Sequence, residues 1–159
     1  MSKSIASSCR NDLGFAMPPS LDHIGIAVPD LAAAVAPFAA LLGPGGAHEE
    51  DLPEMKLRVA RVPAGAAFLE FVQPLAGEES VRRFLDRYGA GLHHVAFAVP
   101  DLDAEVARCR ALGHVPVWPA PRRGAGGRRV MFLHPRTTAG VLMELCEINF
   151  PLQRRAPPV

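Results

Sequence analysis

Two histidines and two glutamates recur at matching places in this sequence. His23 opens the stretch HIGIAVPDL, and His94, 71 residues later, opens the similar stretch HVAFAVPDL. A glutamate follows each histidine at a comparable distance, Glu70 after 47 residues and Glu144 after 50 residues. Imidazole nitrogens and carboxylate oxygens are ligands that divalent first-row metals accept. A lone histidine or glutamate in a strand is ordinarily a packed or solvated residue, but their paired recurrence predicts one metal site with all four as ligands.

His93 competes with His94 for the second histidine position. Aligning HIGIAV with HVAFAV selects His94 and sets His93 opposite Asp22. Because neighbouring residues of a strand point to opposite faces, this alignment predicts that His93 faces away from the metal site.

The elements that must position these residues are a duplicated unit of strand, turn and helix. Residues 21–43 and 92–114 align in register around an identical AVPDL, and such self-similarity is typical of a repeated supersecondary unit. In each copy an apolar run predicts a buried strand that Pro-Asp ends, and Asp30 or Asp101 is placed to cap the following helix. Pro37 lies inside the first helical run and predicts a kink or a late start.

Further strand-like segments follow each helix and are bounded by glycine or proline. They read MKLRVARVP and AAFLEFVQP in the first half, and HVPVWP, RRVMFLHP and GVLMELCEI in the second. Between the halves, GEESVRRFLDRYG predicts a connecting helix over 77–89, with Ser80 or the preceding acidic pair at its N-terminus. We expect one domain over 21–148, made of a module over 21–75 and a module over 92–148, with a mobile extension over 1–20 and a tail over 149–159.

The bulk composition is that of a packed globular protein. Of the 159 residues, 49% are hydrophobic and 21% are charged, and the formal net charge is +1. With no long basic run, no nucleic-acid or membrane partner is expected. Residues 1–20 lack the apolar core of a secretory signal, and no apolar run is long enough to span a membrane. Since Cys9, Cys109 and Cys146 form no CxxC pair, we expect no disulfide, no thiolate zinc site, and a cytoplasmic protein.

Four arginines surround glycines in the segment PRRGAGGRR. Arg122, Arg123, Arg128 and Arg129 could pair with phosphate oxygens while the glycines let the backbone approach a ligand. The alternative is a hairpin or loop with solvated arginines. The Lys-Ser/Thr ending of a nucleotide-binding P-loop is missing.

The paired HIGIAVPDL and LHHVAFAVPDL, with FLHP followed by GVLMELCE, resemble the vicinal oxygen chelate superfamily and, within it, the methylmalonyl-CoA epimerase family. EFVQPLAGEESVRRFL and PRRGAGGRRVMFLHPRTTAGVLMELCE are more similar to the epimerases than to glyoxalases or ring-cleaving dioxygenases. The resemblance covers residues 21–148. It implies an α+β fold in which two paired βαβββ modules form a curved mixed sheet around a metal-lined cleft, and a homodimer. Carried over by motif, the metal ligands are again His23, Glu70, His94 and Glu144.

The resemblance also implies a reaction. This is the epimerisation of methylmalonyl-CoA, an acyl-CoA thioester, at carbon 2, with proton removal and return through a metal-stabilised enediolate. Glu144 would be a catalytic acid/base, and Arg123, Arg128 and Arg129 would hold the coenzyme. Cobalt is the first choice of metal, with manganese, nickel, zinc or magnesium as alternatives.

Two other functions fit the same scaffold: a glyoxalase-like lyase or isomerase at the same metal site, and a metal-free protein that binds small molecules. A non-heme iron dioxygenase would use two histidines and one carboxylate, so the second carboxylate, Glu70, argues against it.

One position departs from the family pattern. The family mechanism uses a second carboxylate in the strand after the first helix, and here that strand reads KLRVARV, with Arg58 or Val59 at the corresponding place. The nearest acidic residues, Glu49, Glu50, Asp51 and Glu54, precede it in an expected loop, where charged side chains are usually solvated. The identity of the second acid/base is therefore open at this stage.

Overall fold

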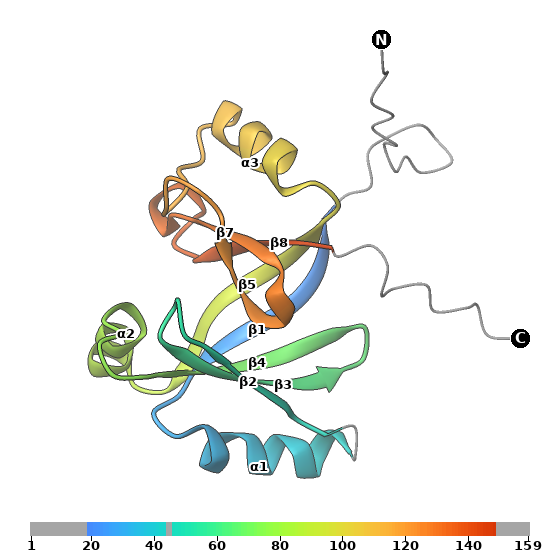
Figure 1. The fold of residues 1–159 in the computed structure, drawn as a ribbon, viewed down its shortest axis with the longest axis vertical. Helices are drawn as coiled ribbons and strands as arrows, with labels where there is room; N and C mark the ends of the chain where they lie inside the picture. Colours follow the sequence, from blue (N-terminus) through green and yellow to red (C-terminus); the bar gives the residue numbers. More distant parts are fainter. Residues whose placement is uncertain (1–18, 44–45, 149–159) are drawn as a thin grey trace, which may run out of the picture.

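A single eight-stranded mixed sheet organises the computed structural model, which describes residues 19–43 and 46–148. The tail predicted over 149–159 lies outside the described residues, as does the predicted N-terminal extension up to residue 18. Figure 1 shows α1 and α3 at opposite ends of the molecule with the strands between them. Together with the three helices, this sheet confirms the predicted α+β class.

Each half of the chain contributes four strands. The first half contains β1 (Ser20–Ala27), α1 (Leu31–Leu42), β2 (His48–Leu52), β3 (Leu57–Ala64) and β4 (Ala67–Pro74). After α2 (Ser80–Tyr88), the second half contains β5 (Gly91–Val99), α3 (Leu102–Ala111), β6 (Arg122–Arg123), the 3-10 turn η1 (Ala125–Gly127), β7 (Arg129–Leu133), the 3-10 turn η2 (Pro135–Thr137) and β8 (Met143–Glu147).

The two halves have the same topology and join at the centre of the sheet. The strand order is β2-β3-β4-β1-β5-β8-β7-β6. In each half the first strand is central, the fourth lies next to it, the third follows, and the second is at the edge. β1 pairs with β4 in parallel, and β5 pairs with β8 in parallel. β1 and β5 pair with each other antiparallel. The duplication read in the sequence is therefore a duplication of structure.

Side-chain caps start the helices where the sequence predicts. The Asp30 carboxylate accepts a hydrogen bond from the backbone N–H of Ala33 at 3.0 Å, and Asp101 accepts one from Ala104 at 2.9 Å. These bonds satisfy amides that a helix leaves free at its first turn. α1 begins at Leu31 and runs through Pro37, so of the two predicted alternatives, a kink or a late start, the late start does not occur.

Two strand predictions are wrong. HEEDL, expected as a loop, is the edge strand β2, where one side faces solvent and charged residues are well tolerated. HVPVWP, expected as a strand, makes only an isolated bridge between Pro116 and Leu133. Its prolines supply no N–H to a strand ladder.

Each long helix packs its apolar residues onto its own half of the sheet. Leu31 and Val35 of α1 pack in a buried cluster with Val62 and Phe71. α3 contributes Leu102, Val106 and Cys109 to a second cluster with Met131, Leu133 and Leu145. None of the helices in the described ranges is long and apolar enough to cross a membrane.

Candidate metal centre

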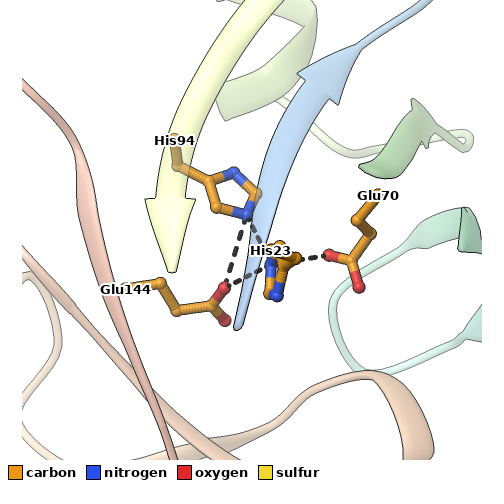
Figure 2. Close-up of side chains that lie close together, drawn as sticks. All are labelled: His23, Glu70, His94 and Glu144. Carbon is orange, nitrogen blue, oxygen red and sulfur yellow. Dashed lines mark hydrogen bonds and ion pairs between the residues drawn. The ribbon is translucent and has the colours of Figure 1, made fainter. Parts of the chain in front are cut away.

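The four residues predicted as ligands meet at the centre of the sheet. His23, Glu70, His94 and Glu144 lie on the four adjacent strands β1, β4, β5 and β8 and are buried (Figure 2). His23 Nε2 lies 3.0 Å from both His94 Nε2 and Glu144 Oε2, and 3.3 Å from Glu70 Oε2. One ligand atom from each of the four residues lies within 4.8 Å of the others. The cluster can therefore hold a metal ion.

Gly25 makes room for this cluster. It pairs with Glu70 of β4 on one side and with His94 of β5 on the other. A Cβ built on Gly25 would lie 2.0 Å from His94 Cε1. No larger residue fits there while His94 keeps its place. Gly25 was not among the residues predicted for the site, although a glycine within a strand pattern signals a close approach.

The donor set fits a divalent cation. His23 Nδ1 lies 2.7 Å from Asp22 Oδ2, and His94 Nδ1 lies 3.0 Å from His93 Nδ1, so the Nε2 atoms of both rings are left to face the carboxylates. Glu70 Oε1 and Glu144 Oε2 are buried, and neither has a well-aligned hydrogen bond within the described residues, although the Nε2 atoms of His23 and His94 lie 3.0 and 3.3 Å from Glu144 Oε2. Burying acceptors without a partner costs free energy. A positive charge placed between the histidine Nε2 atoms and the two carboxylates would remove this cost.

A proton supplies that charge when no metal is bound. Burial alone would lower the pKa of His23, but the carboxylates of Asp22, Glu144 and Glu70 outweigh it and raise this pKa to about 11. Burial would raise the pKa of Glu144, yet the bonds from His23 and His94 lower it to about 2. A bound cation would take the place of the proton, since metal-ligating imidazoles are neutral.

Asp22 links His23 of the cluster to Arg128 in the second half of the chain. Arg128 donates two hydrogen bonds to the Asp22 carboxylate, at 2.7 and 2.8 Å, and Arg61 donates a third at 3.1 Å. Burial would raise the pKa of Asp22, but Arg128 and His23 outweigh it and hold this pKa well below its usual range. Such bidentate pairs are the strong, geometrically specific form of ion pair. Asp22 had no predicted role in the site, because its partner Arg128 lies 106 residues away in the sequence.

The predicted orientation of His93 is wrong. β1 and β5 change register between Gly25 and Ile26, which pair with His94 and Leu92, so His93 is an extra residue in a β-bulge. A bulge interrupts the strict alternation of side chains. His93 therefore lines the same cavity as His94. Burial, and then the neighbouring His94, lowers the pKa of His93 to about 4.

A cavity of about 180 Å³ opens beside the cluster. Apolar side chains from the first half, including Leu57 and Val59, form one part of its lining, and Trp118 and Phe132 form another. The four clustered residues and His93 are among the polar residues that line it. The cavity therefore has room for a short acyl group with its oxygens at the cluster.

The four arginines of PRRGAGGRR diverge. The segment folds as a hairpin in which Arg122 pairs with Val130 and Arg123 with Arg129. Arg122 stacks on Trp118 with its Cζ 4.3 Å from the ring centroid, and exposed Arg123 donates to the carbonyl of Gly127.

The other two arginines are paired with carboxylates. Arg128 is partly buried and pairs with Asp22, as described above. Arg129 bonds Asp103 at 2.7 Å and Glu147 at 3.3 Å. Among the four arginines of this segment, Arg122 and Arg123 have no carboxylate partner within the described residues.

No carboxylate stands at the position where the sequence departs from the family pattern. Val59 is 1% exposed and lines the cavity, while exposed Arg58 bonds Asp51. Glu50 of β2 pairs directly with Val59 of β3. Residues opposite each other in an antiparallel pair share a face of the sheet, so Glu50 shares the cavity-facing side with Val59. Its Oε2 accepts a hydrogen bond from the backbone N–H of Gly126 at 2.8 Å.

The fold and the buried cluster define a class of protein. Residues 22–132 match the model of the Glyoxalase/Bleomycin resistance protein/Dioxygenase superfamily, and the chain belongs to that superfamily. Its relatives narrow this further. It is 34% identical to the ethylmalonyl-CoA/methylmalonyl-CoA epimerase of Cereibacter sphaeroides over 130 residues, which cover 80% of this chain and 97% of that protein.

Two further similarities bear on the site. A structure of a glutamate-to-glutamine variant of Streptomyces coelicolor methylmalonyl-CoA epimerase, in complex with 2-nitronate-propionyl-CoA, is 37% identical with a TM-score of 0.74, over 81% of this chain and 96% of that one. The uncharacterized protein YqjC of Bacillus subtilis is 41% identical over 128 residues, 80% of this chain and 91% of YqjC. The predicted relationship to the epimerases is thereby confirmed.

Proposed function

We propose that this protein epimerises methylmalonyl-CoA at carbon 2. The observation that carries the proposal is the buried cluster of two histidines and two glutamates at the end of a cavity sized for an acyl group. The epimerase relatives, one of them bound to a nitronate analogue of the acyl-CoA, support the same substrate class. The proposed ligands of the metal are His23, Glu70, His94 and Glu144, with cobalt as the first candidate metal.

Epimerisation requires removal of a proton next to a thioester carbonyl and return of a proton to the opposite face of the same carbon. The obstacle is the negative charge that builds on the thioester oxygen. A divalent cation held by the cluster would act as a Lewis acid towards that oxygen. The residues around it must orient the acyl group, exclude water and move the proton.

Glu144 is the proposed acid/base on one side of the carbon. It is buried at the cavity, and only one of its oxygens lies against the two histidines, at 3.0 Å from His23 and 3.3 Å from His94. The other oxygen is left to approach a proton on the substrate. A general base must come within hydrogen-bond reach of the proton that it removes.

Glu50 is the proposed acid/base for the opposite side. It pairs across the strands with Val59, the cavity residue at the place where the family has its second carboxylate. Its present partner is a single backbone amide, that of Gly126. Rotation of the side chain away from Gly126 would free the carboxylate to turn towards the cavity.

The coenzyme must lie mainly outside the cavity, because a nucleotide is larger than the space beside the cluster. Arg123, with its neighbour Arg122, is the proposed contact for the coenzyme phosphates. Arg128 and Arg129, the other two residues that the sequence suggests for this role, keep it only if they leave their carboxylate partners. We also propose that the protein is a homodimer, which sedimentation in solution would test.

Deuterium exchange tests the proposed reaction. The metal-loaded protein is incubated with one epimer of methylmalonyl-CoA in deuterated water, and a mutase specific for the other epimer reports inversion. We expect deuterium at carbon 2 together with inversion. If metal is bound and no exchange occurs, the chemistry is that of another enzyme of the superfamily.

A further inference from the structure

His93 is a polar residue of the cavity that the metal centre does not use. Among the described residues lining the cavity, two imidazole or carboxylate side chains stand outside the four-residue cluster, His93 and Glu78. The Glu78 carboxylate already accepts hydrogen bonds from the first amides of α2, at Ser80, Val81 and Arg82. His93 is therefore the one of the two that is available to a ligand.

The contact with His94 fixes which nitrogen of His93 carries a proton. With the Nε2 lone pair of His94 directed at the cluster, the proton of this neutral ring is on Nδ1. His94 Nδ1 lies 3.0 Å from His93 Nδ1, so His94 donates and His93 accepts. The single proton of a neutral His93 must then be on Nε2. A doubly protonated His93 would instead place two N–H donors against each other.

The ring of His93 is also held in place. Phe84 of α2 packs against it edge to face, with the ring centroids 4.9 Å apart and the planes at 84°. The ring of His94 also packs edge to face with it, with the centroids 5.2 Å apart and the planes at 85°. Since Nδ1 is taken by His94, Nε2–H is the polar group that this fixed ring can offer to an occupant of the cavity.

We propose that His93 donates a hydrogen bond from Nε2 to an oxygen of the acyl thioester, with its tautomer set by the metal ligand His94. This inference rests on the proposed function. The oxygens of a malonyl-type thioester accept hydrogen bonds and gain negative charge when the carbon loses its proton. A preorganised donor at that place stabilises the charged state more than the ground state. His93 thus connects the metal centre to the substrate through a neutral N–H donor.

The test compares two substitutions at His93. His93→Phe keeps a ring beside Phe84 and removes both nitrogens, whereas His93→Gln keeps one acceptor and one donor. His114→Gln is the matched control, because the Nδ1 of His114 bonds the carbonyl of Thr137 and the residue does not line this cavity. Calorimetric titration measures the affinity of each protein for Co²⁺, and then the affinity of the Co²⁺-saturated protein for 2-nitronate-propionyl-CoA.

We expect His93→Phe to weaken binding of the nitronate at saturating Co²⁺ by about tenfold or more, the usual effect of losing a hydrogen bond to a charged group. His93→Gln should recover most of that affinity, and His114→Gln should match the wild type. If nitronate affinity at saturating Co²⁺ is unchanged in His93→Phe, and only Co²⁺ affinity falls, His93 merely positions His94 and the proposal is wrong.

Two outcomes separate this proposal from the function on which it rests. If the wild-type protein does not bind the nitronate, the proposed function fails. If the wild type binds it and His93→Phe binds it equally well, only the role of His93 fails. Thermal unfolding is measured for each variant, and His93→Leu replaces His93→Phe if the latter does not fold.

Discussion

Asp22 and His93 occupy the same position in the two halves of the chain, and each contacts Nδ1 of the histidine that follows it. The distance is 2.7 Å from Asp22 to His23 and 3.0 Å from His93 to His94. One contact is made by a carboxylate and the other by an imidazole. Groups in this position orient metal-ligating histidines and tune their basicity, so the repeat supplies the neighbours of the two histidines as well as the four residues of the candidate metal centre.

Removing Arg128 tests the buried pair that holds Asp22. Asp22 is buried and Arg128 is partly buried, with side chains 6% and 13% exposed, and Arg128→Met removes the bidentate partner of the Asp22 carboxylate. We expect the free energy of unfolding to fall by about 3 kcal/mol, as measured by urea denaturation. Arg108→Met, which breaks the exposed pair with Glu105, should cost less than about 1 kcal/mol. Equal losses in the two variants would contradict a special role for the buried pair.

Replacing Gly25 tests the space that His94 occupies. Gly25→Ala places a Cβ within the position of the His94 ring, so that ring must move away from the cluster. We expect Co²⁺ affinity to fall by about tenfold or more, since displaced ligands and their supports have effects of that size. Gly91→Ala, in β5, meets no atom within 4 Å and should bind Co²⁺ normally. Normal affinity in Gly25→Ala would show that the site adapts around the methyl group.

The two proposed acid/bases are tested by removing their charges. We expect Glu144→Gln and Glu50→Gln each to lower the rate of epimerisation by at least about 100-fold, the usual contribution of a positioned acid/base. Glu49→Gln is the control, because Glu49 pairs with Ala60, one step along β2 and on its other face. Metal content is measured in parallel. A fully active Glu50→Gln protein would remove Glu50 from the mechanism, and a fully active Glu144→Gln protein that retains metal would do the same for Glu144.

The metal-free protein should lose stability as the pH rises above neutrality. The pKa of His23 is raised from 6.5 to about 11 in the folded state, so the stabilisation from its proton is complete below pH 6.5 and is lost as the pH rises towards 11. Asp22, with its lowered pKa, contributes in the opposite direction and loses its effect only in acid. Bound metal replaces the proton on His23, so the melting temperature of the loaded protein should depend less on pH above 6.5. Thermal melts of both forms across pH 5 to 10 measure this difference, and parallel curves would contradict it.

The sequence by itself determined the duplicated strand and helix units, the Asp30 and Asp101 caps and the four residues of the cluster. Caps and strand patterns depend on neighbouring residues, so they can be read locally. Equivalent residues of a repeat take equivalent places in the fold, which is why four residues spread over two halves could be grouped without any structure.

Only the tertiary structure decided how the surroundings of the cluster are built. The bulge that turns His93 into the cavity is a property of the register between β1 and β5, which neither strand specifies alone. The pairing of Arg128 with Asp22 joins residues 106 positions apart. It engages an arginine that the sequence predicted to bind the coenzyme phosphates. The sequence could group the four residues of the cluster because they repeat. Their neighbours Asp22 and Arg128 meet through a contact between the halves, and the burial of such side chains depends on which distant partner reaches them.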